Sequence, residues 1–264
     1  MEQKLPRLVR KSQKGDREAF TQLLLNVARL SGAWASQSAP LDVLDPVCGR
    51  GTTLLEALNA GDNAWGVDVD GKSLDELKAF LKRYMTYHHF KHSTDARSLT
   101  VGGSAKPLWE LTTARDAQAY KVRDVRTLSV IECDTLLCGA LFARRRFHIV
   151  AGDLPYGVQH ATHSGDSRSA FRPGAAGRPG GAKPPRAVTI EQFTAEAVPV
   201  WARLLRPGGV LALSFNAYTL EREALRRQMR DAGLEVCQGG AYDAMEHWVE
   251  QAVMRDMAVG VKPG

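Results

Sequence analysis

Two short segments of this chain carry side chains that could bind a ligand and orient a reacting group. The first is Asp45-Pro-Val-Cys-Gly49-Arg-Gly51-Thr52, between an apolar run and a helical pattern. Glycines at such a junction let the backbone approach a ligand, and the helix start offers N–H donors. The dinucleotide fingerprint G-x-G-x-x-G fails, because Leu54 stands where its third glycine belongs. The acid at Asp45 suits an amine better than a pyrophosphate, and the ammonium group of S-adenosylmethionine meets that requirement.

Two further acids follow the next apolar runs along the chain. Asp68 ends the run Gly66-Val-Asp68, where a carboxylate can accept both hydroxyls of a ribose. Asp134 follows Ser129-Val-Ile-Glu-Cys and could accept from an adenine amino group. Each acid alone could equally be a loop or helix-cap residue. Together with Asp45, acids after three successive strands indicate a nucleoside-binding edge.

The second segment, Asp153-Leu-Pro-Tyr156, is suited to an amine acceptor. An exocyclic amine on a purine or pyrimidine is a poor nucleophile, because its lone pair is delocalised into the ring. The Asp153 carboxylate and the Leu154 carbonyl can accept its two hydrogens, and Pro155 restricts the direction of that carbonyl. Tyr156 can stack on the base and hold the nitrogen in line with the methyl group. A plain turn with a buried tyrosine would suit these residues as well, but the upstream glycine loop favours the catalytic interpretation.

Strands and helices alternate around these segments. Apolar runs of strand length lie at 41–45, 64–68, 129–134, 147–152, 210–215, 234–241 and 248–261. Helical patterns lie at 17–31, from Thr52, at 73–87, from the N-cap Thr189 to 205, and at 219–232. A turn is expected at 206–209. This order predicts an α/β fold with a mostly parallel sheet and helices on both faces.

Residues 1–264 are expected to form one domain with three additions. Residues 1–40 form a short N-terminal helical extension, and 88–127 are an insertion that could form a hairpin. Residues 157–186 are rich in Gly, Pro, Arg and Ser, which predicts a mobile loop over the base pocket. The histidines of the insertion lack a nearby cysteine, so we expect surface histidines and no metal at His88, His89 and His92.

The composition is that of a soluble globular domain, with 44% hydrophobic and 24% charged residues. No apolar run reaches about 18 residues and no leader is visible, so we expect neither a membrane span nor secretion. The four cysteines form no Cys-x-x-Cys pair, which favours a reducing, cytoplasmic setting. The net charge is +6, and clustered basic residues suit either a phosphate backbone or a solvated surface. The clusters lie at 4–14, 144–146, 168–186 and 222–227.

Residues 45–57 and 153–157 together resemble the N2-guanine RNA methyltransferases, in particular the catalytic domains that follow THUMP domains. The likeness spans roughly 17–85 and 129–215. It implies a Rossmann-like, seven-stranded class I methyltransferase fold, S-adenosyl-L-methionine as donor, and a guanine amine in tRNA or rRNA as acceptor. The residues that it places against the base are Asp153, Leu154, Pro155 and Tyr156. Those expected around the cofactor are Asp45, Pro46, Cys48, Gly49, Gly51, Thr52, Thr53, Asp68, Val69 and Asp134. Too few residues precede Asp45 for a THUMP domain, so we expect the catalytic domain without it.

Other functions remain open. DNA methyltransferases that act on adenine N6 or cytosine N4 use a related Asp/Asn-Pro-Pro-Tyr tetrad, so DNA is a possible acceptor. Methyltransferases that modify protein glutamine usually carry Asn at the first position of the tetrad. A non-catalytic nucleotide-binding or RNA-binding module would need a degenerate pocket, and the intact Asp153 and Tyr156 argue against that. A nicotinamide oxidoreductase conflicts with the failed glycine fingerprint.

Overall fold

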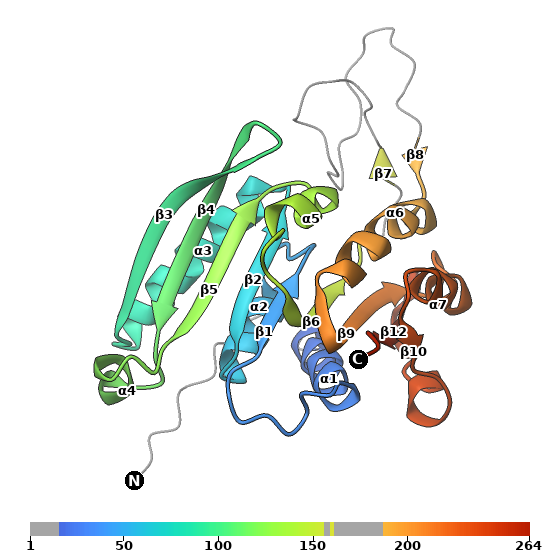
Figure 1. The fold of residues 1–264 in the computed structure, drawn as a ribbon, viewed down its shortest axis with the longest axis horizontal. Coiled ribbons are helices and arrows are strands. Elements are labelled where there is room, and N and C mark those ends of the chain that lie inside the picture. The colour runs from blue at the N-terminus through green and yellow to red at the C-terminus, as the bar shows by residue number, and fades with distance from the viewer. Residues whose placement is uncertain (1–15, 156–158, 161–186) are drawn as a thin grey trace, which may run out of the picture.

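The computed structural model describes residues 16–155, 159–160 and 187–264, and these form an α/β structure around one large sheet (Figure 1). Within the described residues the sheet contains ten strands. Along the chain they are β1 (Asp42–Asp45), β2 (Asn63–Asp68), β3 (His92–Val101), β4 (Ser104–Thr113), β5 (Arg126–Glu132), β6 (Phe147–Asp153), β9 (Leu205–Asn216), β10 (Glu235–Val236), β11 (His247–Glu250) and β12 (Val253–Val261).

The sheet has a parallel centre and antiparallel edges. Its order is β10-β12-β9-β6-β1-β2-β5-β4-β3, and β11 pairs with β12 outside this path. Strands β5, β2, β1, β6 and β9 run parallel, whereas β12 and β4 run antiparallel to their neighbours in that block. Successive strands spread in opposite directions from β1 and β6, so the topological switch point lies between these two strands. In open α/β sheets ligands bind at such a point, beyond the carboxyl ends of the strands.

Helices cover both faces of the sheet, as the alternating pattern predicts. The helices are α1 (Asp16–Ser31), α2 (Thr52–Asn59), α3 (Gly71–Tyr87), α4 (Ala117–Lys121), η1 (Thr135–Leu137), α5 (Cys138–Leu141), α6 (Ile190–Arg203), α7 (Arg222–Asp231) and η2 (Gly240–Asp243). One apolar core contains Leu24 of α1 and Leu77 of α3, and the other contains Trp201 of α6 and Leu225 of α7. The parallel strands between these layers are buried on both sides, which explains their nearly unbroken apolar runs.

The expected insertion contains a long antiparallel hairpin, β3–β4, which widens the sheet at its β5 edge (Figure 1). Gly102 and Gly103 form its turn with φ of +57° and +80°, values that favour glycine. Pairing with β5 ends at Leu108 opposite Ile131, so the hairpin tip extends past the carboxyl end of β5. Burial raises the pKa of the Cys133 thiol and Lys106 of the hairpin partly offsets this effect, so Lys106 lies near Cys133.

Three sequence-based boundaries are wrong. The turn expected at 206–209 belongs to β9, which begins at Leu205, and Gly208 (φ +72°) enters the strand pairing beside an irregular register with β6. The last strand expected at 248–261 is instead the hairpin β11–β12, and the strand expected at 234–241 is reduced to the two residues of β10. Glycines there permit backbone conformations that a residue pattern does not reveal.

Several expectations concern segments that the structure does not describe. Residues 1–15, Tyr156 and most of the loop expected at 157–186 lie outside the described residues. Two short strands of that region are described, β7 (Gln159–His160) and β8 (Ala187–Val188), and they pair antiparallel. None of the helices in the described ranges is long and apolar enough to cross a lipid bilayer.

Candidate active site

The glycine loop links the end of β1 to the start of α2 through two left-handed residues. Gly49 has φ +48°, and Gly51, the N-cap of α2, has φ +80°. A Cβ at Gly51 would lie 2.5 Å from the nearest side-chain carbon of Leu77, so both conformation and space require glycine there. The loop is closed by a hydrogen bond of 2.7 Å from Gly51 N to Cys48 O, and by an ion pair of 3.2 Å between Arg50 and Glu76 of α3. The first-turn N–H groups of α2, which have no partner within the helix, therefore lie at the carboxyl edge of the sheet.

Asp68, the last residue of β2, holds this loop. Its Oδ2 accepts from Gly49 N at 2.6 Å, and its Oδ1 accepts from Asp70 N at 2.8 Å. Burial nevertheless raises the pKa of the Asp68 carboxyl, with these backbone hydrogen bonds acting in the opposite direction. A carboxylate can accept about four hydrogen bonds, so this role is compatible with contact to a ribose.

Asp45, the last residue of β1, is a buried carboxyl group with 2% of its surface exposed. It accepts from Val47 N at 3.0 Å and from the Thr53 hydroxyl. Its pKa is raised from 3.8 to about 7, mainly by burial and to a smaller extent by the nearby Asp68 and Asp153, while the hydrogen bonds from Thr53 and Val47 act in the opposite direction. The main influences on this pKa within the described residues include no basic side chain. An ammonium group would supply the missing positive charge.

Gly152 lies on β6 beside Asp45 of β1, and its lack of a side chain leaves space for the Asp45 carboxyl group. A Cβ added at Gly152 on β6 would lie 3.0 Å from Asp45 Oδ1 and 3.1 Å from the Val47 side chain. Both contacts are tighter than packed side chains normally allow. The next residue of β6 is Asp153, so the two carboxylates end neighbouring strands at the same edge.

Asp153 is held by two side chains from the strands beyond β6. Ser214 Oγ on β9 donates to Asp153 Oδ1 at 2.7 Å, and Arg255 on β12 forms an ion pair with Oδ2 at 3.2 Å. The Asp153 side chain is 38% exposed, whereas that of Arg255 is 2% exposed. Leu154 is buried, and its N–H donates to Ser214 O at 2.7 Å. The segment from Asp153 to Pro155 is therefore fixed to β9 and partly open at the sheet edge.

The remaining predicted cofactor residues divide into two groups. Pro46, Thr52, Thr53 and Val69 belong to the loop and strand ends described above. The Cys48 side chain instead faces the core: a Cβ at Gly66 would lie 2.8 Å from Cys48 Sγ, and burial raises the pKa of this thiol well above its ordinary value. Only the backbone of Cys48 can therefore serve the loop. Asp134 caps η1 by accepting from Leu136 N at 2.9 Å, the helix-cap role that the sequence left open.

The sequence reasoning missed Ser214 and Arg255. Both lie in strands that were predicted, but only as core elements. The charged pair Arg255-Asp256 within a mostly apolar strand was the available signal, because a buried guanidinium requires a partner. Phe20 of α1 makes a cation–π contact with Arg255, because its ring centroid lies 5.4 Å from the guanidinium carbon.

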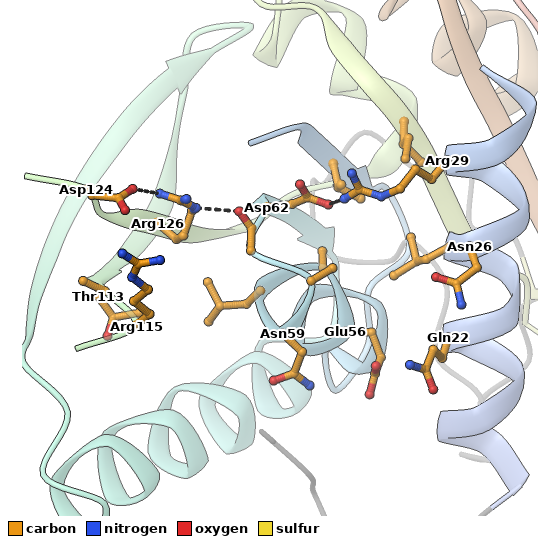
Figure 2. A pocket seen from close by; sticks show the side chains of 18 of the residues that line it. Gln22, Asn26, Arg29, Glu56, Asn59, Asp62, Thr113, Arg115, Asp124 and Arg126 are labelled. Atoms are coloured by element: carbon orange, nitrogen blue, oxygen red, sulfur yellow. Dashed lines mark hydrogen bonds and ion pairs between the residues drawn. The ribbon is translucent and has the colours of Figure 1, made fainter. Parts of the chain in front are cut away.

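A cavity of about 490 Å³ lies elsewhere, at the amino ends of β2 and β5 (Figure 2). Its walls include the Arg29–Asp62 ion pair and Arg126, which bonds to Gly61 O and to Asp124. None of the predicted site residues lines it. The cavity is therefore separate from the carboxyl edge that carries Asp45 and Asp153.

Several residues of the described basic clusters have partners within the chain. Residues 144–146 precede β6 and so lie at the opposite edge from Asp153. There Arg145 stacks over Trp65 at 4.2 Å, and Arg146 donates to Phe142 O and neighbouring carbonyls. Arg226, part of the cluster at 222–227, is buried in an ion pair with Asp243 at 2.6 Å, so this side chain serves neither a phosphate backbone nor a solvated surface. The clusters at 4–14 and 168–186 lie outside the described residues.

The histidines of the hairpin region have packing roles. His88 packs against Tyr84 and Tyr87, and His92 Nδ1 lies 2.9 Å from Phe90 O. Among the residues with described positions, no group of three or more His, Cys, Asp or Glu side chains could hold a metal ion.

The sequence matches no family model and no curated protein. Among solved structures, magnesium protoporphyrin IX methyltransferase from Synechocystis with bound S-adenosylmethionine is similar, with a TM-score of 0.51 and 13% identity over 96% of this chain and 85% of that one. The same enzyme with bound S-adenosylhomocysteine gives a TM-score of 0.50 and 12% identity, over 96% and 88% of the two chains. TrmN from Thermus thermophilus has a TM-score of 0.48 and 17% sequence identity. The match covers 93% of this chain and 48% of the TrmN chain. The Synechocystis structures show that this chain has the Rossmann-like fold of class I methyltransferases, so the predicted fold class is confirmed. The expected number of seven strands is too low, because β3, β4 and β11 bring the sheet to ten strands within the described residues.

Proposed function

We propose that this protein is an S-adenosylmethionine-dependent methyltransferase that acts on the exocyclic amine of guanine in RNA, either tRNA or rRNA. The observation that carries the proposal is the partly exposed Asp153 carboxylate at the end of β6, beside the strand that ends in Asp45. An acceptor held at Asp153 would adjoin a ligand held at Asp45 and the glycine loop. Methyl transfer requires this proximity of donor and acceptor.

The residues around the glycine loop suit S-adenosylmethionine. Asp45 offers a buried carboxylate to the ammonium group, and Asp68 offers acceptors to the ribose. The first turn of α2 offers N–H donors and a positive dipole end to the carboxylate of the amino-acid tail. When bound, S-adenosylmethionine supplies an electrophilic methyl group with a neutral thioether as leaving group.

The acceptor side would be served by Asp153 and Leu154. Asp153 accepts one N–H of the amine and the Leu154 carbonyl accepts the other, so the nitrogen lone pair is directed away from the ring system. Ser214 and Arg255 keep the carboxylate in one orientation. Tyr156, which is outside the described residues, supplies the stacking surface in this proposal.

RNA is the preferred nucleic acid because the two chemical segments resemble those of the N2-guanine RNA methyltransferases. The net charge of +6 is compatible with a phosphate-rich partner. The tip of the β3–β4 hairpin projects past the same sheet edge as Asp153 and offers a wall for a large substrate. DNA with an adenine or cytosine acceptor is the second candidate, since related tetrads serve those amines.

The experiment combines purified protein, S-adenosylmethionine with a labelled methyl group, and total RNA. Asp153→Asn should lower the transfer rate about 100-fold or more, because a charged acceptor at the reacting amine is lost. Affinity for S-adenosylhomocysteine should stay within about twofold, because Asp153 is proposed to contact only the acceptor.

Asp243→Asn is the matched control. Asp243 is also partly exposed and paired with a buried arginine, but it lies in η2. Its transfer rate should equal that of the unmodified protein. Full activity of Asp153→Ala, which removes both acceptor oxygens, would show that the acceptor amine is oriented by other groups.

A further inference from the structure

We infer that Arg255 is a positioning residue for methyl transfer: through its ion pair with Asp153 it fixes the carboxylate that the acceptor amine contacts. The inference rests on the proposed function and assigns a role to a strand outside the expected catalytic segments. Arg255 would touch neither donor nor acceptor.

Arg255 is buried, so its positive charge must be stabilised by neighbouring side chains. The side chain is 2% exposed, on a strand whose following residues Met257 and Val259 belong to the apolar core. A guanidinium in such a position is costly unless ion pairs and hydrogen bonds compensate it. Asp153 Oδ2 provides the ion pair at 3.2 Å, and the Phe20 ring provides a cation–π contact.

Ser214 anchors the other oxygen of the same carboxylate. It is 1% exposed, lies directly opposite Asp153 in the β6–β9 pairing, and donates at 2.7 Å. Both anchors thus come from β9 and β12, on the side of β6 that faces away from β1 and Asp45. Two anchors on two oxygens define the plane of the carboxylate as well as its position. Since a carboxylate can accept about four hydrogen bonds, this arrangement is compatible with an additional N–H from the substrate.

Held by Ser214 and Arg255, the Asp153 carboxylate acts as a fixed hydrogen-bond acceptor for the amine. In the transfer step the nitrogen lone pair forms the N–C bond, the S–C bond breaks, and its electron pair remains on sulfur. The nitrogen then carries a positive charge and must release one N–H proton. The Asp153 side chain is 38% exposed at the sheet edge, so water can reach the nitrogen and accept this proton.

The chain provides a matched control for this inference. Arg226 of α7 is also buried, with 8% of its side chain exposed, and pairs at 2.6 Å with Asp243, which is 45% exposed. Replacing either arginine by methionine removes a buried positive charge that is paired with a more exposed aspartate. Only Arg255 is joined to the proposed acceptor site.

The test measures kcat, KM for total RNA, S-adenosylhomocysteine affinity and the denaturant midpoint of the full chain. Arg255→Met should lower kcat about 100-fold, because a small misplacement of the acceptor has that effect, with KM and cofactor affinity within about twofold. Arg226→Met should lower the midpoint comparably and leave kcat within about twofold. Ser214→Ala, which removes an anchor without a buried charge, should lower kcat about tenfold.

Rescue separates positioning from general destabilisation. Arg255→Lys should recover part of kcat, and millimolar guanidinium ion should raise the kcat of Arg255→Ala but not that of Arg226→Ala. The inference is overturned if Arg255→Met or Ser214→Ala keeps full kcat, if Arg226→Met loses as much kcat as Arg255→Met, or if neither rescue occurs. A wild-type protein that does not methylate RNA would instead overturn the proposed function.

Discussion

Asp45 binds a proton near neutral pH, and this property makes ligand affinity depend on pH. Its pKa of about 7 results mainly from burial, so the carboxyl group is protonated below that pH and ionised above it. An ammonium ligand binds only the ionised form. Affinity for S-adenosylhomocysteine should therefore be high at pH 8 and should fall about tenfold per pH unit below pH 7.

Calorimetric titration between pH 5.5 and 8.5 measures this dependence. Asp45→Asn cannot ionise, so its weaker affinity should be nearly constant over the same range. Affinities of the unmodified protein that do not change between pH 6 and 8 would show that Asp45 does not contact the ammonium group.

The residues that sequence reasoning could assign are those that follow apolar runs. Asp45, Asp68 and Asp153 end parallel strands, and the parallel arrangement brings them to one edge, so their order in the sequence is sufficient. Ser214 and Arg255 lie within β9 and β12 and approach Asp153 only through strand register. Register depends on pairing across long sequence separations, and residue types do not specify it in advance. The direction of the Cys48 side chain was not predictable for a related reason, because it depends on contact with Gly66 on the neighbouring strand.

At the scale of elements, the β3–β4 hairpin is the largest addition to the parallel block. Its tip passes the carboxyl end of β5. Lys106 of the hairpin lies near Cys133, the residue that directly precedes Asp134. Replacing residues 100–105 with Asn-Gly would shorten the tip while keeping a turn suited to the hairpin. This variant should bind S-adenosylhomocysteine normally and should show a KM for RNA raised about tenfold, if the tip contributes about 1.4 kcal/mol of substrate binding.

The control for this prediction is the denaturant midpoint, which should fall only by the loss of the buried Val101 side chain, because pairing of β4 with β5 begins at Leu108 and is kept. An unchanged KM would show that substrate does not reach the hairpin. The sequence predicted a hairpin in this segment from its glycines and β-forming residues. It could not predict the overhang, which depends on where β4 meets β5.

Some helix and strand boundaries depend on neighbouring residues in the sequence, and others depend on contacts with distant residues. The capping box at the start of α6 is visible in the sequence, since Thr189 and Gln192 each bond the other's backbone N–H. The extension of β9 through residues 206–209 was not visible. There Gly208 N donates to Lys262 O and Lys262 N donates to Gly209 O, so a distant strand end draws a turn-like sequence into the sheet.

At the scale of the whole molecule, the two edges of the parallel block carry different features. The carboxyl edge holds the glycine loop and Asp153, and the amino edge holds the 490 Å³ cavity around the Arg29–Asp62 pair (Figure 2). Ligands of open α/β sheets bind at the carboxyl edge. Adding S-adenosylhomocysteine should therefore slow amide hydrogen exchange in residues 47–55 and 68–71, and leave residues 113–126 beside the cavity unchanged.

Exchange measured by mass spectrometry with and without ligand would resolve these segments. S-Adenosylhomocysteine and adenosine should protect overlapping segments, because the ribose is proposed to contact Asp68. Protection concentrated in 22–29 and 113–126 would assign the ligand to the amino-edge cavity and remove Asp45 from the site.

The most direct test of the proposed function is the identity of the methylated nucleoside. Purified protein, S-adenosylmethionine with a deuterated methyl group and total cellular RNA would be incubated together, and the RNA would then be digested to nucleosides for mass spectrometry. N2-methylguanosine carrying the deuterated methyl group should accumulate with the unmodified protein and not with Asp153→Ala. A label found only in another nucleoside, in added DNA, or in no nucleic acid would contradict the assignment of a guanine amine in RNA.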